Sequence, residues 1–307
     1  MRETHAPPYP LRCKTRLTGR HDSTRWDHYT PRAGDTVVAA FPKCGTTWME
    51  HIVLNLFHQG PAVPLIAEVA PWVELRFRRG NQPGPELPAA ELIQMLARQT
   101  HRRQMKTHLP LDCLPYHPEV KYLVVGRDAR DACMSAYNHD RGLGRIDEDT
   151  PIAEYWRAWI TTIEDGRSYP EPSRAGAHPL FDYYQQWWDY RQLDNILFVH
   201  FADLKQDLTG EIRRVAAFLG VDAPEARLQT VRDATTFASM KANAEQLLPN
   251  MTEFRGGANT FIYKGTNGRW REALSAEDLQ RYEPVAARGA SPACRAWLEG
   301  GRTRVEP

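Results

Sequence analysis

Apolar and polar positions follow two periods along the chain, and each period predicts one kind of element. Short apolar runs rich in small and β-branched residues are typical of buried strands. Apolar residues at helical spacing, such as Trp48, Ile52 and Leu56, predict a helix. We expect strands at 36–41, 104–108, 120–126 and 196–201. We expect helices from 46 to Gly60, over 89–100, after an N-cap at Asp128, over 180–192 and over 203–219.

The alternation of strands and helices predicts the α/β class, as a single domain with a central parallel sheet flanked by helices on both faces. We place this domain at 35–300, after an irregular lead-in at 1–34 with early strand pieces, and before a tail at 301–307. The segment 244–270 is rich in Gly, Asn and Thr, and we expect it to lack regular structure. The aromatic helix FDYYQQWWDY is more typical of core packing than of a ligand cage.

Composition and charge exclude several classes of protein. Hydrophobic residues make up 42% and charged residues 25% of the 307 positions, which is ordinary for a globular protein. The net charge of +1 does not favour nucleic acid as a partner. The five cysteines form no CxxC pair, which favours reduced thiols in a cytoplasmic protein over disulfides or zinc. The N-terminus lacks an apolar signal-peptide core, and no run of apolar residues is long enough to span a membrane.

The stretch FPKCGTTW, between the first predicted strand and its helix, is the first candidate for chemistry. A glycine turn at a helix N-terminus presents backbone N–H groups to a phosphate. The nucleotide-binding pattern GxxxxGK[ST] places its lysine just after the glycine. Here Thr46 occupies that slot, and Lys43 precedes Gly45 by two residues. Lys43 therefore approaches the bound group from the other side, where it can meet a transferred group and its leaving oxygen.

Four stretches in order make this sequence resemble the cytosolic-type sulfotransferases, which use 3′-phosphoadenosine 5′-phosphosulfate (PAPS). FPKCGTTW is similar to the PKSGTTW loop of that family, and MKTHLP to its catalytic strand and loop. KYLVVGRDARDACMSAYNH resembles the strand and helix that bind the 3′-phosphate. FIYKGTNGRW resembles the RKGxxGDW loop that closes over the donor. The resemblance spans residues 41–270 and implies a P-loop-type sulfotransferase fold.

The resemblance also implies site residues. The cradle for the phosphosulfate is expected at Lys43, Cys44, Gly45, Thr46 and Thr47. Residues near the adenine are expected at Trp48, Phe201, Thr235 and Phe237. The 3′-phosphate is expected at Arg127, Ser135, Tyr263, Lys264 and Gly265. The catalytic residues are expected at Lys43, Lys106 and His108.

Sulfuryl transfer explains these residue types. It is an in-line displacement in which charge spreads over equatorial oxygens, so positioned cations such as Lys43 and Lys106 stabilise it without a metal. The acceptor hydroxyl loses a proton as it attacks, and His108 is a suitable general base. We therefore expect a sulfotransferase with PAPS as donor, 3′-phosphoadenosine 5′-phosphate (PAP) as product and no metal.

Three positions depart from the family pattern. Cys44 replaces a serine, Tyr263 replaces the arginine of RKG, and Arg269 replaces the aspartate of GDW. A thiol is a weaker hydrogen-bonding group than a hydroxyl. Because Tyr263 replaces the arginine, one charge contact to the 3′-phosphate is expected to be missing. The family's dimerisation sequence KxxxTVxxxE is not evident, so the oligomeric state is open.

Two alternatives remain open at this point. One is a P-loop kinase or NTPase that uses Mg-ATP, and the other is a catalytically silent nucleotide-binding module. The acceptor is not fixed by the sequence. Abundant Trp, Phe and Tyr favour a small apolar or aromatic alcohol, while phenols, sterols, sugars, amines and a protein tyrosine stay possible. Variable loops at 61–88, 141–180 and 244–260 are expected to line its pocket.

Overall fold

The computed structural model describes residues 8–58, 63–77, 86–161, 176–249 and 251–307. Its centre is a four-stranded sheet in the order β2-β1-β3-β4, with every neighbouring pair parallel. In register, Thr36 lies beside both Gln104 and Lys121. The strands are β1 (Thr36–Ala40), β2 (Gln104–Thr107), β3 (Lys121–Gly126) and β4 (Ile196–His200). The sequence therefore predicted the class, the parallel arrangement and the four strands correctly.

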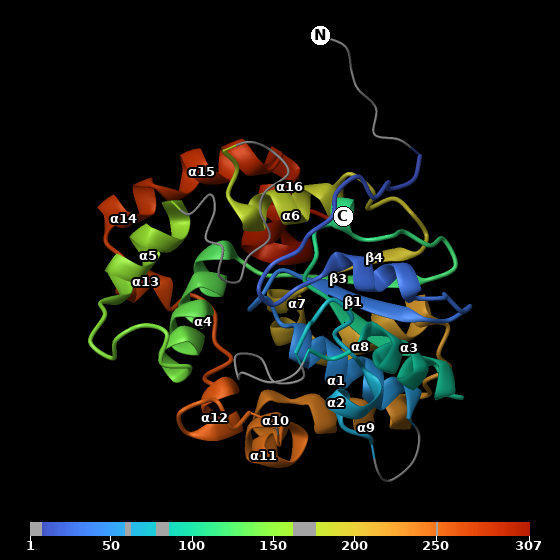
Figure 1. Cartoon of the computed structure of the whole chain (residues 1–307). Helices are drawn as coiled ribbons and strands as arrows, with labels where there is room; N and C mark the ends of the chain where they lie inside the picture. The colour runs from blue at the N-terminus through green and yellow to red at the C-terminus, as the bar shows by residue number, and fades with distance from the viewer. Residues whose placement is uncertain (1–7, 59–62, 78–85, 162–175, 250) are drawn as a thin grey trace.

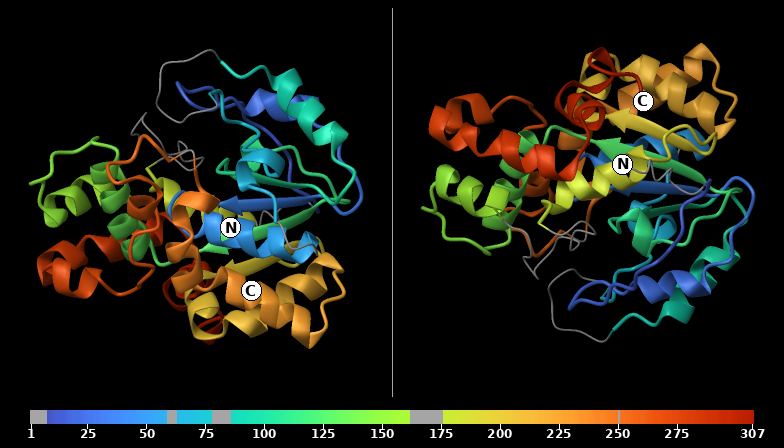
Figure 2. Two further views of the ribbon diagram at one scale, coloured as in Figure 1. Left: turned by 90° about the horizontal axis from the view of Figure 1, so that it is seen from below. Right: turned by 90° about the horizontal axis from the view of Figure 1, so that it is seen from above.

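Helices cover both faces of this sheet (Figures 1 and 2). Alternate residues of β1 and β3, such as Val38 and Leu123, belong to a core cluster shared with α1 (Thr46–Phe57), α8 (Leu208–Leu219) and α9 (Glu225–Thr235). The other set, such as Val37 and Val124, joins a larger cluster with α4 (Ala129–Gly142), α6 (Pro179–Trp188) and α16 (Pro292–Gly300). Burial on two faces explains why these strands are apolar at consecutive positions.

The aromatic helix α6 lies in the core. Its Tyr183, Tyr184 and Trp187 are fully buried. Trp297 of α16 packs against the same helix, with its ring 6.0 Å from that of Tyr184. A Cβ atom on Gly126 of β3 would lie 2.2 Å from the Trp297 ring, so glycine is needed there. The interpretation of this helix as core rather than as a ligand cage is confirmed.

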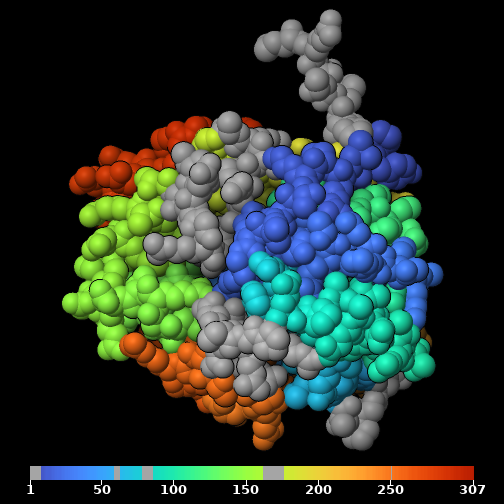
Figure 3. Space-filling view, viewed as in Figure 1, coloured from blue at the N-terminus to red at the C-terminus, as the bar shows by residue number. Residues whose placement is uncertain are grey.

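The remaining elements are helices that surround this core. The α-helices are α2 (Ile66–Val69), α3 (Ala89–Arg98), α5 (Ile152–Thr161), α7 (Phe201–Gln206), α10 (Phe237–Ala242), α11 (Ala244–Leu247), α12 (Gly257–Phe261), α13 (Trp270–Ala273), α14 (Ala276–Gln280) and α15 (Tyr282–Gly289). The 3-10 helices are η1 (Ser23–His28), η2 (Leu111–Cys113) and η3 (Gly301–Thr303). In the space-filling view, the early part of the chain lies between the α4–α5 region and α3 (Figure 3).

Two expectations about regular structure were wrong. The helix expected over 203–219 is two helices, because Asp207 ends α7 and its carboxylate accepts a hydrogen bond from Gly210 N (2.8 Å) to cap α8. The segment 244–270 contains α11 and α12, whose Ala244 and Ala258 form a small core of their own. Their apolar faces are too short for a helical period to be seen in the sequence. The expected helix end at Gly60 lies outside the described residues.

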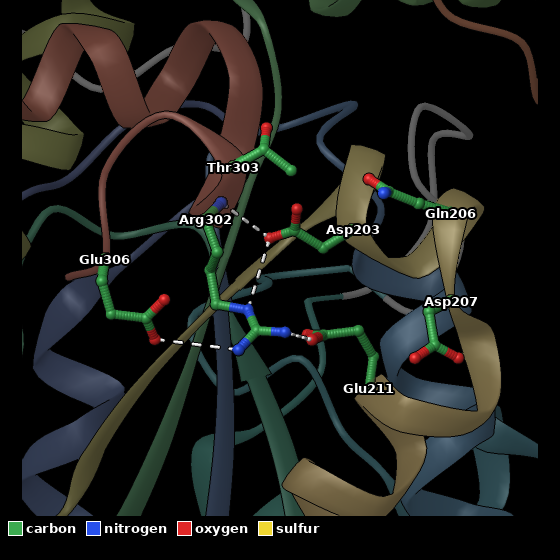
Figure 4. A pocket seen from close by; sticks show the side chains of 7 residues that line it. All are labelled: Asp203, Gln206, Asp207, Glu211, Arg302, Thr303 and Glu306. Carbon is green, nitrogen blue, oxygen red and sulfur yellow. Dashed lines mark hydrogen bonds and ion pairs between the residues drawn. The ribbon is translucent and has the colours of Figure 1, made fainter.

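Segments near both ends of the described chain are packed against the rest of the molecule. Trp26 of η1 is only 2% exposed and belongs to the large core cluster. At the other end, Arg302 is held in a pocket by carboxylates (Figure 4). Its main-chain N–H donates to Asp203 (3.0 Å), and its guanidinium pairs with Glu211 (2.7 Å) and Glu306 (3.7 Å). Among the residues that the structure describes, no helix has the length and apolar character needed to cross a membrane.

Candidate active site

The residues predicted for the site gather at the carboxyl ends of the four strands. The loop 41–45 follows β1, His108 follows β2, Arg127 follows β3 and Phe201 follows β4. Parallel α/β sheets bind ligands at this edge, because loops and helix N-termini converge there. The β2-β1-β3-β4 order also places the loop after β1 in the middle, between the end of β2 and the end of β3, which Arg127 follows.

The loop before α1 has an unusual backbone. Lys43 has φ 70°, the one non-glycine residue with positive φ in the described chain, and Gly45 has φ 109°. A Cβ on Gly45 would lie 3.0 Å from the Phe201 ring, so the loop passes close to that ring. A lysine in the left-handed region costs about 1–2 kcal/mol, and such strain persists where the surroundings enforce it. The loop thus presents its backbone at the start of α1, as an anion site requires.

Of the four residues predicted near the adenine, Trp48 contacts two others, Thr235 and Phe201. The Trp48 Nε1–H donates to the carbonyl of Thr235 (2.7 Å). The ring of Trp48 meets that of Phe201 edge-on, with 5.2 Å between centroids. Phe237 packs elsewhere, since a Cβ on Gly265 would lie 2.3 Å from its ring. These contacts join α1, α7 and α9 into one aromatic surface.

Arg127 connects this surface to the closing loop. Its guanidinium donates to Asn267 Oδ1 (3.1 Å), to the carbonyl of Thr266 (2.9 Å) and to the carbonyl of Lys43 (3.4 Å). The group lies 4.1 Å from the centroid of the Phe201 ring. Burial lowers the pKa of Arg127, and the nearby Asp131 carboxylate opposes that shift. Arg127 is thus a buried cation whose present partners are neutral oxygens.

The other residues expected at the 3′-phosphate are less enclosed. Ser135 is half-buried on α4, and Lys264 is exposed. Tyr263 is 42% exposed, and its ring lies 5.4 Å from the Lys264 ammonium and 5.3 Å from the Arg269 guanidinium. The sequence did not single out Asp131, which accepts a hydrogen bond from Gly268 N (2.7 Å) and so fixes the closing loop to α4. An aspartate one turn into a helix gives no sequence signal for such a contact.

His108 is fixed in one tautomer. Its Nδ1 lies 2.6 Å from the carbonyl oxygen of Ala40, at the end of β1. A carbonyl only accepts, so Nδ1 carries the proton and Nε2 keeps a free lone pair. Burial, and then the neighbouring Lys106 ammonium, lower the pKa of His108 to about 3. The ring is therefore neutral near pH 7, as a proton acceptor must be, and a bound anion would raise that pKa.

A buried carboxylate that the sequence did not reveal holds the loop of His108. Glu74 accepts hydrogen bonds from the His108 backbone N–H (2.7 Å), Thr107 Oγ1 (3.0 Å), Trp72 Nε1 (2.6 Å) and Trp26 Nε1 (3.0 Å). The Trp72 ring also meets the His108 ring edge-on, at 4.8 Å. The proline-rich surroundings of Glu74 indicated only a loop, because the partners of Glu74 are distant in sequence.

The two lysines lie on the same side of the site. Burial lowers the pKa of Lys43 to about 7; the Asp140 carboxylate opposes this shift, while Arg127 and Lys106 add to it. The Lys43 ammonium lies 4.7 Å from the centroid of the Phe261 ring. The Lys106 ammonium lies 3.6 Å from a carboxylate oxygen of Glu50 and 5.1 Å from the Trp72 ring. A bound dianion would offset the electrostatic repulsion among these cations.

Cys44 differs from the other loop residues. Its side chain is fully buried in the large core cluster, with Sγ 3.8 Å from the carbonyl of Pro42. Burial raises the pKa of the thiol to about 11. A protonated, enclosed thiol is a poor nucleophile, so the geometry favours a packing role for the sulfur.

Comparison with known proteins identifies the class of protein. Residues 33–289 match the sulfotransferase domain family, and the chain therefore belongs to that family. A glycolipid sulfotransferase of Mycobacterium bovis is 30% identical over 93% of this chain and 94% of its own length. Sulfotransferase 1A1 of Rattus norvegicus is 26% identical over 83% of this chain and 84% of its own length. The chain is a sulfotransferase, and this finding replaces the alternative of a Mg-ATP kinase.

Solved structures show the same fold. The crystal structure of a mouse sulfotransferase complexed with PAP, SULT7A1, matches with a TM-score of 0.68 and 19% identity, over 88% of this chain and 90% of that one. Retinol dehydratase in complex with androsterone and PAP matches with a TM-score of 0.68 and 23% identity, over 87% of this chain and 83% of that one. These likenesses confirm the predicted sulfotransferase fold.

Proposed function

We propose that this sulfotransferase moves the sulfuryl group of PAPS to a hydroxyl of an apolar or aromatic acceptor, with His108 as general base. The observation that carries the proposal is the hydrogen bond between His108 Nδ1 and Ala40 O (2.6 Å). It leaves Nε2 as the proton acceptor, beside the cation on Lys106 and next to the phosphate loop. The PAP bound in the two related crystal structures supports the choice of donor.

The donor is expected to lie across the carboxyl edge of the sheet. The loop 43–47 and the start of α1 would hold its 5′ end, through backbone N–H groups and the hydroxyls of Thr46 and Thr47. Trp48 and Phe201 offer ring surfaces to the adenine. The planar fork of Arg127 suits the 3′-phosphate, and Ser135 and Lys264 are its expected helpers.

Each catalytic residue has one task in the displacement. His108 Nε2 accepts the proton of the acceptor hydroxyl as its oxygen forms a bond to sulfur. The bond between sulfur and the bridging oxygen breaks, and PAP leaves with that electron pair. Lys43 stabilises the charge that develops on the leaving oxygen, and Lys106 stabilises the equatorial oxygens of the transferred group.

A cluster of aromatic rings beside the Lys43 ammonium supports an apolar or aromatic acceptor. Phe261, which lies against the Lys43 ammonium, is 5.4 Å from the Phe254 ring. His139 meets Phe254 at 5.0 Å and Phe261 at 6.2 Å, which completes a cluster of three rings. Parts of the loops expected to line the pocket, at 61–62, 78–85, 162–175 and 250, lie outside the described residues. The mycobacterial relative is a glycolipid sulfotransferase, which adds glycolipids to the acceptors worth testing.

Two measurements test the proposal in sequence. Calorimetric titration with PAP, and with ATP in the presence and absence of Mg²⁺, tests the donor site. We expect metal-independent binding of PAP that is much tighter than binding of ATP, and a preference for Mg-ATP would overturn the choice of donor. Transfer of ³⁵S from PAPS to a panel of phenols, sterols, alkanols and glycolipids then tests catalysis. PAP binding without transfer to any member would favour the silent module instead.

A further inference from the structure

Among the described residues, one buried carboxylate near the site pairs with a single charged group. Glu50 lies one turn into α1, four residues after Thr46, and its side chain is 1% exposed. Within the described part of the chain, neither of its carboxylate oxygens has a hydrogen-bond partner. The Lys106 ammonium, 3.6 Å from one oxygen, is the cation that pairs with it there. Glu211, another buried glutamate, is instead paired with both Arg214 (2.8 Å) and Arg302 (2.7 Å).

A buried carboxylate without other hydrogen bonds destabilises the fold unless its charged partner stays in place. Removing a charged group from water carries a penalty of several kcal/mol, and the loss of one partner leaves the other uncompensated. Burial raises the pKa of Glu50, and the Lys106 ammonium opposes that shift. The attraction acts in both directions: Lys106 favours the ionised form of Glu50, and Glu50 holds the Lys106 ammonium.

Lys106 is held by neighbours on several elements and is not fully enclosed. On the sheet, Lys106 pairs with Val38, whose side chain packs toward α1. The main chain of Glu50 is tied to β2, because Gln104 Nε2 donates to its carbonyl oxygen (3.2 Å). Trp72 lies over the ammonium at 5.1 Å. The Lys106 side chain is 20% exposed, so part of it is accessible to a ligand.

We propose that Glu50 is a positioning residue that holds the Lys106 ammonium in the place where it meets the transferred sulfuryl group. The inference rests on the proposed catalytic role of Lys106. Glu50 supplies a negative charge 3.6 Å from the Lys106 ammonium, on a side chain that is itself buried. The carboxylate occupies one side of the ammonium, and the sulfuryl oxygens are bound on the other.

The first test separates turnover from donor binding. PAP lacks the sulfuryl group, so a residue that acts through Lys106 should affect transfer and not the binding of PAP. We expect Glu50→Gln to lower kcat by roughly 10- to 100-fold, as displacement of a positioned group does, with the Kd of PAP unchanged within about twofold. A structural role in α1 would instead weaken PAP binding, because α1 begins at the phosphate loop.

The second test is a double-mutant cycle. In a Lys106→Met background, Glu50→Gln should have no further effect on kcat, since its only route to the reaction is gone. The Tm should fall in Lys106→Met and recover in the double variant, because the buried carboxylate then no longer lacks a partner. Glu211→Gln is the matched control, a buried glutamate outside the site, and it should leave kcat unchanged.

The outcomes distinguish the two proposals. If Lys106→Met alone keeps normal kcat, the proposed catalytic role of Lys106 is wrong, and Glu50 has nothing to position. If Lys106→Met loses kcat but Glu50→Gln either has no effect or adds its full effect in the double variant, catalysis by Lys106 stands and the inference about Glu50 is overturned. Loss in both single variants, without addition, supports the inference.

Discussion

Arg127 and His108 both follow a buried strand, yet they are held by groups of different kinds. The partners of Arg127 are oxygens of two loops, on Lys43, Thr266 and Asn267. The partners of His108 are the end of β1 and the buried carboxylate of Glu74. Phosphate oxygens can replace the loop oxygens around Arg127 when a donor binds, whereas nothing in the reaction requires the contacts of His108 to change. The donor side is thus adjustable, and the catalytic side is fixed before binding.

The largest effect is expected from the fixed side. His108→Ala removes the proton acceptor, and we expect kcat to fall by about 10²- to 10⁴-fold. The Kd of PAP should stay within about twofold of the wild-type value, because the binding of PAP involves no proton transfer to His108. Steady-state transfer assays and calorimetry measure the two quantities. Unchanged turnover would show that another group removes the proton.

Glu74 tests whether the fixed side depends on its buried anchor. Glu74→Ala leaves four donors without their acceptor, and we expect the free energy of unfolding to fall by about 3 kcal/mol. Urea denaturation measures this change. Glu283→Ala is the control, since its exposed ion pair with Arg295 should contribute less than about 1 kcal/mol. Equal losses in the two variants would mean that Glu74 is no anchor.

Arg127 tests the adjustable side. Arg127→Lys keeps a positive charge but loses the planar fork of donors. We expect the Kd of PAP to rise about 10-fold in this variant, and kcat to fall much less. In the wild type, PAP should also protect residues 255–270 from limited proteolysis. Cleavage at the same rate with and without PAP would contradict a loop that exchanges its partners for the donor.

The pH dependence of donor binding reports on Lys43. The pKa of Lys43 is lowered to about 7 by burial, so the free side chain loses its charge as the pH rises through 7. The anionic donor favours the charged form, so binding takes up a proton above pH 7 and the Kd of PAP rises with pH, by up to about 10-fold per unit. Calorimetry in two buffers of different ionisation enthalpy measures the uptake. Lys43→Met should abolish it.

The smallest effect concerns the altered closing loop. Arg269 lies beside the Tyr263 ring and adds to the lowering of the pKa of Arg127, so it is near the expected 3′-phosphate. We expect Arg269→Ala to weaken PAP binding by about threefold, the amount typical of an exposed charge. Tyr263→Phe is the control and should change nothing. A loss as large as that of Arg127→Lys would make Arg269 a principal contact.

Local signals accounted for most of the fold and named the candidate residues of the donor side. The strands, α1 and the cap at Asp128 follow from apolar runs and from single residues whose roles are local. Short motifs singled out Lys43 and Arg127, which each follow the end of a strand, and the closing loop between α12 and α13. Glu50 and Glu74 were not predicted, because a buried carboxylate is recognised only by partners such as Lys106 and Trp26, far away in sequence. The helices within 244–270 were missed for a different reason: their apolar faces are too short for a helical period to be seen in the sequence.

The packing of Trp297 against β3 has a consequence for synthesis. The Leu298 carbonyl accepts a hydrogen bond from the His200 ring (3.0 Å), and the Trp297 ring lies 5.0 Å from that of Phe198 on β4. Two of the four strands therefore pack against a helix that is synthesised well after them. A nascent chain that still lacks this helix exposes apolar surface on one side of its sheet. Exposed apolar surface of this kind favours aggregation until the helix packs.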